Sequence, residues 1–145
     1  MEYAEFESRV AQRAGIPVDE VEAAAEATLA TLSERLPDDE SRAVAEQLPE
    51  PASTFLTAAD GRQSFGYDEY LARVGERMDD ATGVERAAAE RRAQTVVAVL
   101  LDAADSETTD DLLSYLSPDY EPLLELVEPE AVWGPGWRER LGEQW

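Results

Sequence analysis

The amino-acid sequence predicts an all-α protein, in which two tandem copies of a three-to-four-helix unit pack as one helical bundle and a short helix follows at the C-terminus. Apolar residues recur at helical spacing along most of the chain, and Gly, Pro and capping residues separate these segments. No segment alternates apolar and polar residues as a half-buried strand does. Finally, a segment near the N-terminus recurs in the middle of the chain.

This recurrence predicts a duplication. The segment Tyr3–Arg13 (YAEFESRVAQR) returns as Tyr67–Arg77 (YDEYLARVGER), with five identical positions and an offset of 64 residues. Further along the offset becomes 68, because Ala27–Leu32 matches Thr95–Leu100. Repeats of this length usually represent one supersecondary unit used twice. We therefore expect a duplicated helical domain over residues 1–127, followed by a Trp-rich tail at 128–145. Within the domain, repeat 1 covers about residues 1–58, a linker covers 59–66, and repeat 2 covers about 67–127.

The first unit divides into four helical segments. Gly15 and then Pro17 end the first of them. The second begins at Asp19, with Glu22 three residues later as the partner of a capping box, and ends at Pro37. The apolar stripes of these two segments are Tyr3, Phe6, Val10 and Ala14, and then Val21, Ala25, Thr28, Leu29, Leu32 and Leu36. Two shorter segments follow, with Val44 and Leu48 in one and Phe55 and Leu56 in the other.

The second unit follows the same plan. Phe65 and Tyr70 stand at the positions of a hydrophobic staple around the start of its first helix. Thr82, with Glu85 three residues later, is predicted to cap a long second helix, and Ser106 is predicted to cap the third. The apolar residues of the last three segments are Val84, Ala88, Ala93, Val96, Val97, Leu100 and Leu101, then Leu112, Leu113 and Leu116, then Leu123, Leu124 and Val127.

The composition excludes several functional classes. The chain has 33 acidic and 12 basic residues, and all the basic residues are Arg. Without His or Cys it can form no zinc finger, thiol nucleophile or Ser–His pair, and without Lys it can form no Schiff base or P-loop. No apolar run approaches the ~20 residues of a membrane span. The N-terminal segment has no signal-peptide pattern, so we expect a cytoplasmic protein without a membrane partner.

The net charge of −21 should repel nucleic-acid phosphates and anionic lipids. Two interpretations of this charge remain. It favours adaptation to molar salt, since the acids are spread along the chain, with −9 in residues 1–66, −10 in 67–127 and −2 in the tail. The alternative is a specific electrostatic role, as a nucleic-acid mimic or an antagonist of a basic partner, for which we would expect the charge on one element.

Two pairs of arginines are candidate anion contacts, because guanidinium groups suit carboxylate and phosphate. The pairs, each at i, i+4 beside an apolar stripe, are Arg9 and Arg13, and Arg73 and Arg77. The structural alternative is that they bind the chain's own carboxylates, since Glu5–Arg9 and Glu69–Arg73 also stand four residues apart. Arg91 and Arg92 interrupt the long helix of the second unit and suggest no chemistry.

Acidic clusters at 38–40, 79–80 and 102–111 offer oxygen ligands of the kind that Ca²⁺ or Mg²⁺ prefers. However, the run from Asp105 to Asp110 lacks the Gly of an EF-hand loop. All three clusters fall where we expect helices to begin, so capping and the helix dipole explain them. We therefore expect no metal and no other cofactor. A pair of catalytic carboxylates is not identifiable, and we expect a non-enzymatic protein.

The C-terminal tail contains all three tryptophans of the chain. Trp133 precedes a Gly-Pro-Gly hinge, and Trp137, Leu141 and Trp145 then stand four residues apart, as one stripe of a short helix. Exposed tryptophans often mark contact sites. These four residues are therefore candidate contacts for a partner protein or a second copy of the chain. The alternative is that the stripe covers the open end of the bundle.

The pattern Tyr-x-Glu-Phe-x-x-Arg-Val at Tyr3–Val10, the Ala-rich second helix and the Leu48–Pro49 end together resemble the domain of unknown function 2267 family. These are small helical proteins of bacteria and archaea, and the resemblance covers residues 1–127. Its acidity makes this chain look like a haloarchaeal version. The resemblance implies the helical fold but no activity, and no site residue is carried over from it.

These observations favour a non-enzymatic module for protein–protein interaction, adapted to high salt, with an unidentified protein or a second copy as its partner. The alternative is a protein that binds a small ligand or anion in a pocket between the two helical repeats, through the arginine pairs. An acidic antagonist of a basic partner is a third hypothesis.

Overall fold

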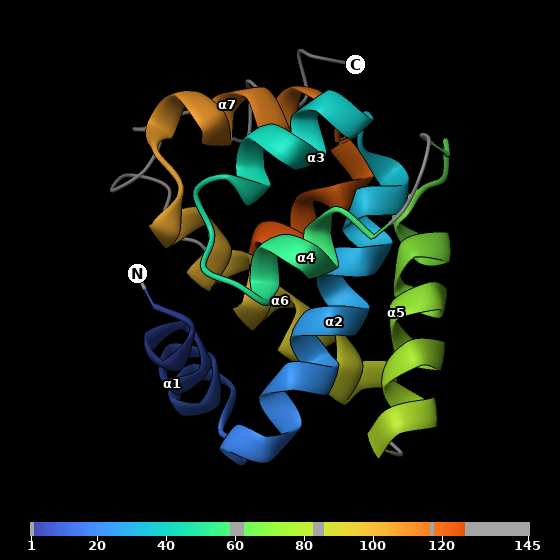
Figure 1. Ribbon diagram of the computed structural model, residues 1–145. Coiled ribbons are helices and arrows are strands. Elements are labelled where there is room, and N and C mark those ends of the chain that lie inside the picture. The colour runs from blue at the N-terminus through green and yellow to red at the C-terminus, as the bar shows by residue number, and fades with distance from the viewer. Residues whose placement is uncertain (1, 59–62, 83–85, 117, 127–145) are drawn as a thin grey trace.

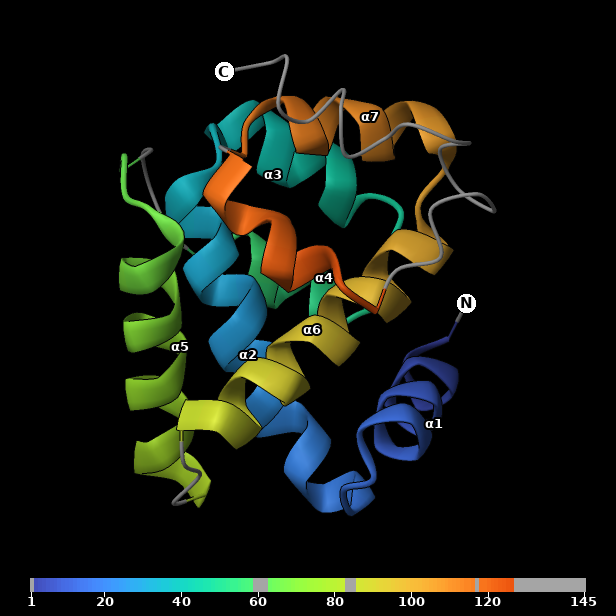
Figure 2. The same cartoon turned by 180° about the vertical axis from the view of Figure 1, so that it is seen from behind.

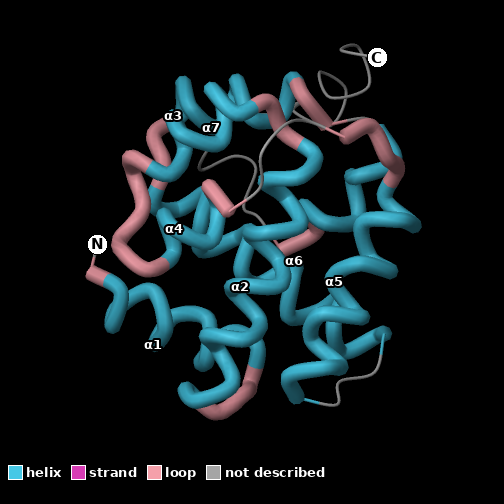
Figure 3. The backbone as a smooth tube through the Cα atoms, turned by 45° about the vertical axis from the view of Figure 1, so that its right-hand side comes forward, coloured by secondary structure: helices cyan, strands magenta, loops and turns pink. Residues whose placement is uncertain are grey.

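The computed structural model describes residues 2–58, 63–82, 86–116 and 118–126, and in these residues every regular element is a helix (Figures 1 and 3). The all-α prediction is therefore confirmed. The elements are α1 (Tyr3–Ala14), α2 (Val18–Arg35), α3 (Asp38–Ala45), α4 (Ala52–Leu56), α5 (Tyr67–Thr82), α6 (Arg86–Ala103), α7 (Ser106–Ser114) and the 3-10 helix η1 (Pro118–Leu124). Over the described ranges, none of these helices has the length and apolar character needed to cross a membrane.

The two long helices α2 and α6 contact each other, and the remaining helices are arranged around them (Figures 1 and 2). Helix α1 packs against α6, and α5 packs against α2, so each first helix contacts the second helix of the other half of the chain. Within each half, α4 packs on α2 and η1 packs on α6, whereas α3 of the first half pairs with α7 of the second. The two halves thus share one core. The duplication itself stays a prediction from the sequence.

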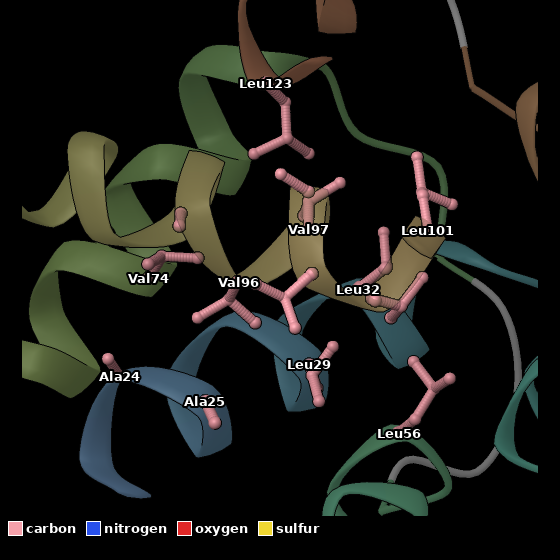
Figure 4. Close-up of a cluster of buried hydrophobic side chains, with 14 of the residues drawn as sticks. Ala24, Ala25, Leu29, Leu32, Leu56, Val74, Val96, Val97, Leu101 and Leu123 are labelled. Carbon is pink, nitrogen blue, oxygen red and sulfur yellow. The ribbon is translucent and has the colours of Figure 1, made fainter. Parts of the chain in front are cut away.

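The core consists of aliphatic side chains that α2 and α6 direct toward each other and toward the surrounding helices. Figure 4 shows part of this cluster, to which α4, α5 and η1 also contribute side chains. Its labelled members are Ala24, Ala25, Leu29, Leu32, Leu56, Val74, Val96, Val97, Leu101 and Leu123. All of these side chains are at most 2 % exposed. Helices α2 and α6 are therefore buried on several faces and not only along one apolar stripe.

A cluster of three tyrosines joins the two halves beside this core. Tyr70 of α5 is fully buried, and its hydroxyl donates to the carbonyl of Thr28 in α2 at 3.1 Å. The Tyr70 ring stacks with Tyr67 at 6.1 Å and meets Tyr120 of η1 edge-on at 5.6 Å between centroids. Burial raises the pKa of Tyr70 well above its ordinary value and that of Tyr120 to about 12. The hydroxyls of Tyr70 and Tyr120 are therefore neutral at physiological pH.

Several helix ends differ from the predictions. Gly15 ends α1 in the left-handed conformation, with φ of 69°, as expected. In contrast, α2 begins at Val18 directly after Pro17, and no side chain caps it, so the predicted start at Asp19 is wrong. Because the ring of Pro17 holds φ at −63° in extended backbone, the helix starts one residue earlier and Asp19 lies within its first turn.

The second half also needs two corrections. Asp105, not Ser106, caps α7, because its carboxylate accepts from the backbone N–H of Thr108 at 2.8 Å, which also lowers the pKa of Asp105. Helix α5 extends to Thr82, so residues 79–80 lie at its end and not at a helix start. The helix dipole therefore does not explain that acidic pair.

Helices α3 and α7 are joined by a polar clamp at one end of their contact. The side-chain amide of Gln47 donates to Asp105 Oδ2 at 3.0 Å and to Thr108 Oγ1 at 2.7 Å, and it accepts from the Asp105 N–H at 2.7 Å. Elsewhere on α3, Glu40 is only 8 % exposed. Burial, together with the negative charge of Asp111 on α7, raises the pKa of Glu40.

Candidate functional site

The structure separates the two arginine pairs, because α1 and α5 lie on opposite sides of the central helices (Figures 1 and 2). On the α1 side, Arg9 bonds Glu5 at 3.1 Å, one turn away on an exposed face. Arg13 instead reaches across to α6 and bonds Asp102 at 2.9 Å. The four arginines that the sequence singled out therefore do not converge on one pocket between the halves.

On the α5 side, both arginines converge on one carboxylate. Arg77 bonds Glu34 of α2 at 2.9 Å and donates to Thr31 Oγ1 at 2.6 Å. Arg73 lies 3.6 Å from the same carboxylate, and its guanidinium covers the ring of Phe65 at 4.2 Å from the centroid. The Glu34 side chain is only 17 % exposed. These groups bind one another, and Arg73 also bonds Glu69 on its own helix at 2.8 Å.

The ion pairs Arg13–Asp102 and Arg77–Glu34 stand at positions that correspond by the sequence offsets. With the sequence offsets of 64 and 68, Arg13 corresponds to Arg77, and Asp102 corresponds to Glu34. The α1 side differs in two ways. Asp102 is one methylene shorter than Glu34. Arg9 and its counterpart Arg73 each bond the glutamate one turn earlier on their own helix, Glu5 at 3.1 Å and Glu69 at 2.8 Å, but only Arg73 also lies near the interhelical pair, 3.6 Å from Glu34. Asp102 is therefore more exposed, at 31 %.

A cavity of about 340 Å³ lies at this more open pair. Its described lining consists of Arg13 from α1, Arg91 and Asp102 from α6, and Leu126 directly after η1. The cavity is therefore formed between a helix of the first half and a helix of the second. Pockets for small ligands typically have volumes of about 300–1,000 Å³, so this cavity is at the lower end of that range.

Arg91 differs from the other arginines around it. The structure describes the side chains of eight arginines, and within the described ranges seven of them form an ion pair, donate a hydrogen bond or cover an aromatic ring. These seven are Arg9, Arg13, Arg35, Arg42, Arg73, Arg77 and Arg92. Only Arg91 has none of these contacts in that part of the chain, although the protein has 33 carboxylates.

The charges of the described lining therefore do not cancel. Among these residues Asp102 neutralises Arg13, and the exposed guanidinium of Arg91 remains as one surplus positive charge, in a chain of net charge −21. A guanidinium presents its donors in a fixed fork, which suits two oxygens of a carboxylate or phosphate. The described arrangement can therefore bind an anion.

The sequence interpretation missed Arg91, which was assigned no chemistry. One signal was present, because the residue that corresponds to Arg91 at the offset of 68 is Ala23. If the predicted duplication is correct, the fold of the unit does not require an arginine at this position, and the same holds for Arg92, whose counterpart is Ala24. The neighbouring Arg92 is different, because it bonds Glu20 of α2 at 3.2 Å and is only 14 % exposed.

Other features of the described chain are less suited to a ligand. A second, more open groove of about 490 Å³ lies along the end of α3 and along α4. It is lined by Arg42, Ala45, Glu46, Leu48, Glu50, Ser53, Thr54 and Thr57. Its one described arginine, Arg42, lies 3.8 Å from Asp39.

Among the described residues, no group of three or more acidic side chains is placed to hold a metal ion. Trp133, Trp137, Leu141 and Trp145 lie outside the described residues.

Comparison with known proteins agrees with the resemblance found in the sequence. The family model of DUF2267, described as an uncharacterised conserved protein, matches residues 3–123, from the start of α1 into η1. No curated protein matches the sequence. The matched region includes Arg13, Arg91 and Asp102 and excludes the Trp-rich tail. Because the model covers most of its length, the chain belongs to the DUF2267 family.

Proposed function

We propose that the protein is a non-enzymatic binding protein that holds a small anion in the cavity between α1 and α6. The observation that carries this proposal is the guanidinium of Arg91, which lines the cavity without a partner among the described residues. The sequence suggested the same kind of function as an alternative, a ligand pocket between the two halves. The residues proposed here differ from those that the sequence suggested. Of the four predicted arginines only Arg13 lines the cavity, and its role is to position the wall through Asp102.

Anions are expected to raise the melting temperature of the wild-type protein but not that of Arg91→Gln. A ligand at about 100 times its Kd stabilises a protein by about 2.7 kcal/mol, which corresponds to several degrees for a domain of this size. Thermal melts followed by circular dichroism, with acetate at constant ionic strength, test this. The matched control is Arg9→Gln, which removes the same charge from an exposed arginine outside the cavity. Equal shifts in all three proteins would contradict the proposal.

A second proposal is an interaction role for the tail, supported by the stripe of Trp137, Leu141 and Trp145 at spacings of four residues. The double substitution Trp137→Ala and Trp145→Ala should abolish self-association or capture of a partner while the helix content is unchanged. Light scattering and pull-down with the full chain, the double variant and a chain ending at Val127 test this. If the double variant unfolds instead, the tryptophans belong to the core.

We also propose that the acidity is an adaptation to molar salt in a cytoplasmic protein that binds neither nucleic acid nor membranes. The charge of −21 and the absence of Cys support this. The melting temperature should rise from low salt to molar KCl, because the screening length falls from about 30 Å at 0.01 M to about 3 Å at 1 M and weakens repulsion between the acids. Equal stability at both concentrations would favour an acidic antagonist of a basic partner.

A further inference from the structure

We infer that the anion held in the cavity between α1 and α6 is a small monocarboxylate with an apolar body. Its carboxylate would bind the guanidinium of Arg91, and its apolar part would lie against Leu126. This inference rests on the proposed anion-binding function and specifies the class of ligand. Charge, volume and the nature of the wall each support it.

The charge of the site favours a single negative charge on the ligand. Arg13 and Asp102 neutralise each other at 2.9 Å, so Arg91 offers one unmatched positive charge. A monocarboxylate completes that pair. Phosphate carries up to two negative charges at neutral pH, so its second charge would remain unpaired in a chain whose net charge is already −21. The site therefore discriminates against phosphate and other dianions.

The volume indicates a ligand larger than the carboxylate itself. A cavity of about 340 Å³ has the volume of roughly ten water molecules. A bare acetate would fill only a small part of it and leave water against the wall. A branched or cyclic body of a few carbon atoms would displace that water and fill the space beyond the guanidinium.

The wall of the cavity suits such a body. Leu126 is a partly buried side chain that packs against the hydrophobic core, and it is the apolar member of the described lining. The aliphatic stems of Arg13 and Arg91 add further apolar surface beside it. On the corresponding α5 side, Arg73 covers Phe65 and lies beside Arg77 at Glu34, so its guanidinium and the ring occupy the surface next to the ion pair. The two corresponding sites thus differ in the features that would accommodate this ligand.

The test is calorimetric titration of the full chain with four probes at constant ionic strength. Acetate and isovalerate carry the same charge but differ in the apolar body. Isovaleramide keeps that body without the charge, and inorganic phosphate supplies a dianion. The variants are Arg91→Gln, Leu126→Ala and the control Arg9→Gln, none of which removes a fully buried side chain.

We expect isovalerate to bind about tenfold more tightly than acetate, since burial of its additional carbon atoms is favourable. Isovaleramide and phosphate should bind at least as weakly as acetate. Arg91→Gln should abolish binding of both carboxylates, and Leu126→Ala should weaken isovalerate alone. Arg9→Gln should bind as the wild type does.

The possible results separate the two proposals. If acetate, isovalerate and phosphate bind equally and Arg91→Gln abolishes all three, the anion site stands and the ligand class inferred here is wrong. If isovaleramide binds as well as isovalerate, the carboxylate is not the recognised group. If no probe binds at millimolar concentration, or if binding survives Arg91→Gln, both the ligand class and the anion-binding function are wrong.

Discussion

Tyr120→Ala should lower the free energy of unfolding by about 3–5 kcal/mol, the usual cost of removing a buried aromatic side chain. Tyr120 is fully buried in η1 and meets the rings of Tyr67 and Tyr70 at 5.5 and 5.6 Å between centroids. The guanidinium of Arg35 lies 5.6 Å from the centre of the same ring. Because this ring joins η1 to α2 and α5, its removal leaves a cavity where the two halves meet. Urea denaturation followed by circular dichroism measures the change.

Tyr120→Phe separates the packing contribution from that of the hydroxyl. The hydroxyl of Tyr120 donates to the carbonyl of Phe65 at 2.8 Å. Its loss should cost about 1 kcal/mol, the typical net contribution of one hydrogen bond. If Tyr120→Ala costs no more than Tyr120→Phe, then η1 is not part of the core as described.

A chain divided between the two halves should assemble only when both fragments are present. In the described structure α1 packs on α6 and α5 packs on α2, so each fragment alone lacks a principal packing surface for its first helix. We expect fragments 1–60 and 61–145 to have low helix content separately and to recover most of it as a one-to-one complex. The measurement is circular dichroism of the separate and mixed fragments, with the mass of the complex from light scattering.

Because both fragments are acidic, this experiment needs molar KCl to screen their repulsion. A chain ending at Val127 is the control for shortening, since it retains every described helix and should keep its helix content. If each fragment folds as a stable monomer, the contacts of α1 with α6 and of α5 with α2 are not what holds the two halves together.

The candidate site shows most clearly what the sequence alone could not supply. Arg9 and Arg13 are indistinguishable by spacing and chemistry, yet Arg9 bonds Glu5 on its own helix and Arg13 reaches Asp102 on α6. The first contact is local and follows from the four-residue spacing. The second joins residues 89 positions apart, and no local pattern identifies that partner.

The sequence by itself determined the all-α class, most helix boundaries and the family, because helical periodicity, glycine caps and proline breaks act within one or two turns. It did not determine every helix end, since Pro17 displaced the start of α2 and Asp105 took the capping position predicted for Ser106. Each of these errors is one residue, because two neighbouring residues can often both serve as the N-cap of a helix and the local sequence distinguishes poorly between them.

Only the tertiary structure decided how the halves meet and where a ligand can bind. The packing of α1 on α6, and of α5 on α2, depends on which helix faces bury the most surface together, and many pairings are compatible with the same periodicity. The cavity at Arg91 follows from that packing, because its described lining combines Arg13 of α1 with Arg91 and Asp102 of α6. The shape of a cavity depends on residues that are distant in the sequence but close in space. The spacing of residues along the chain therefore does not predict it.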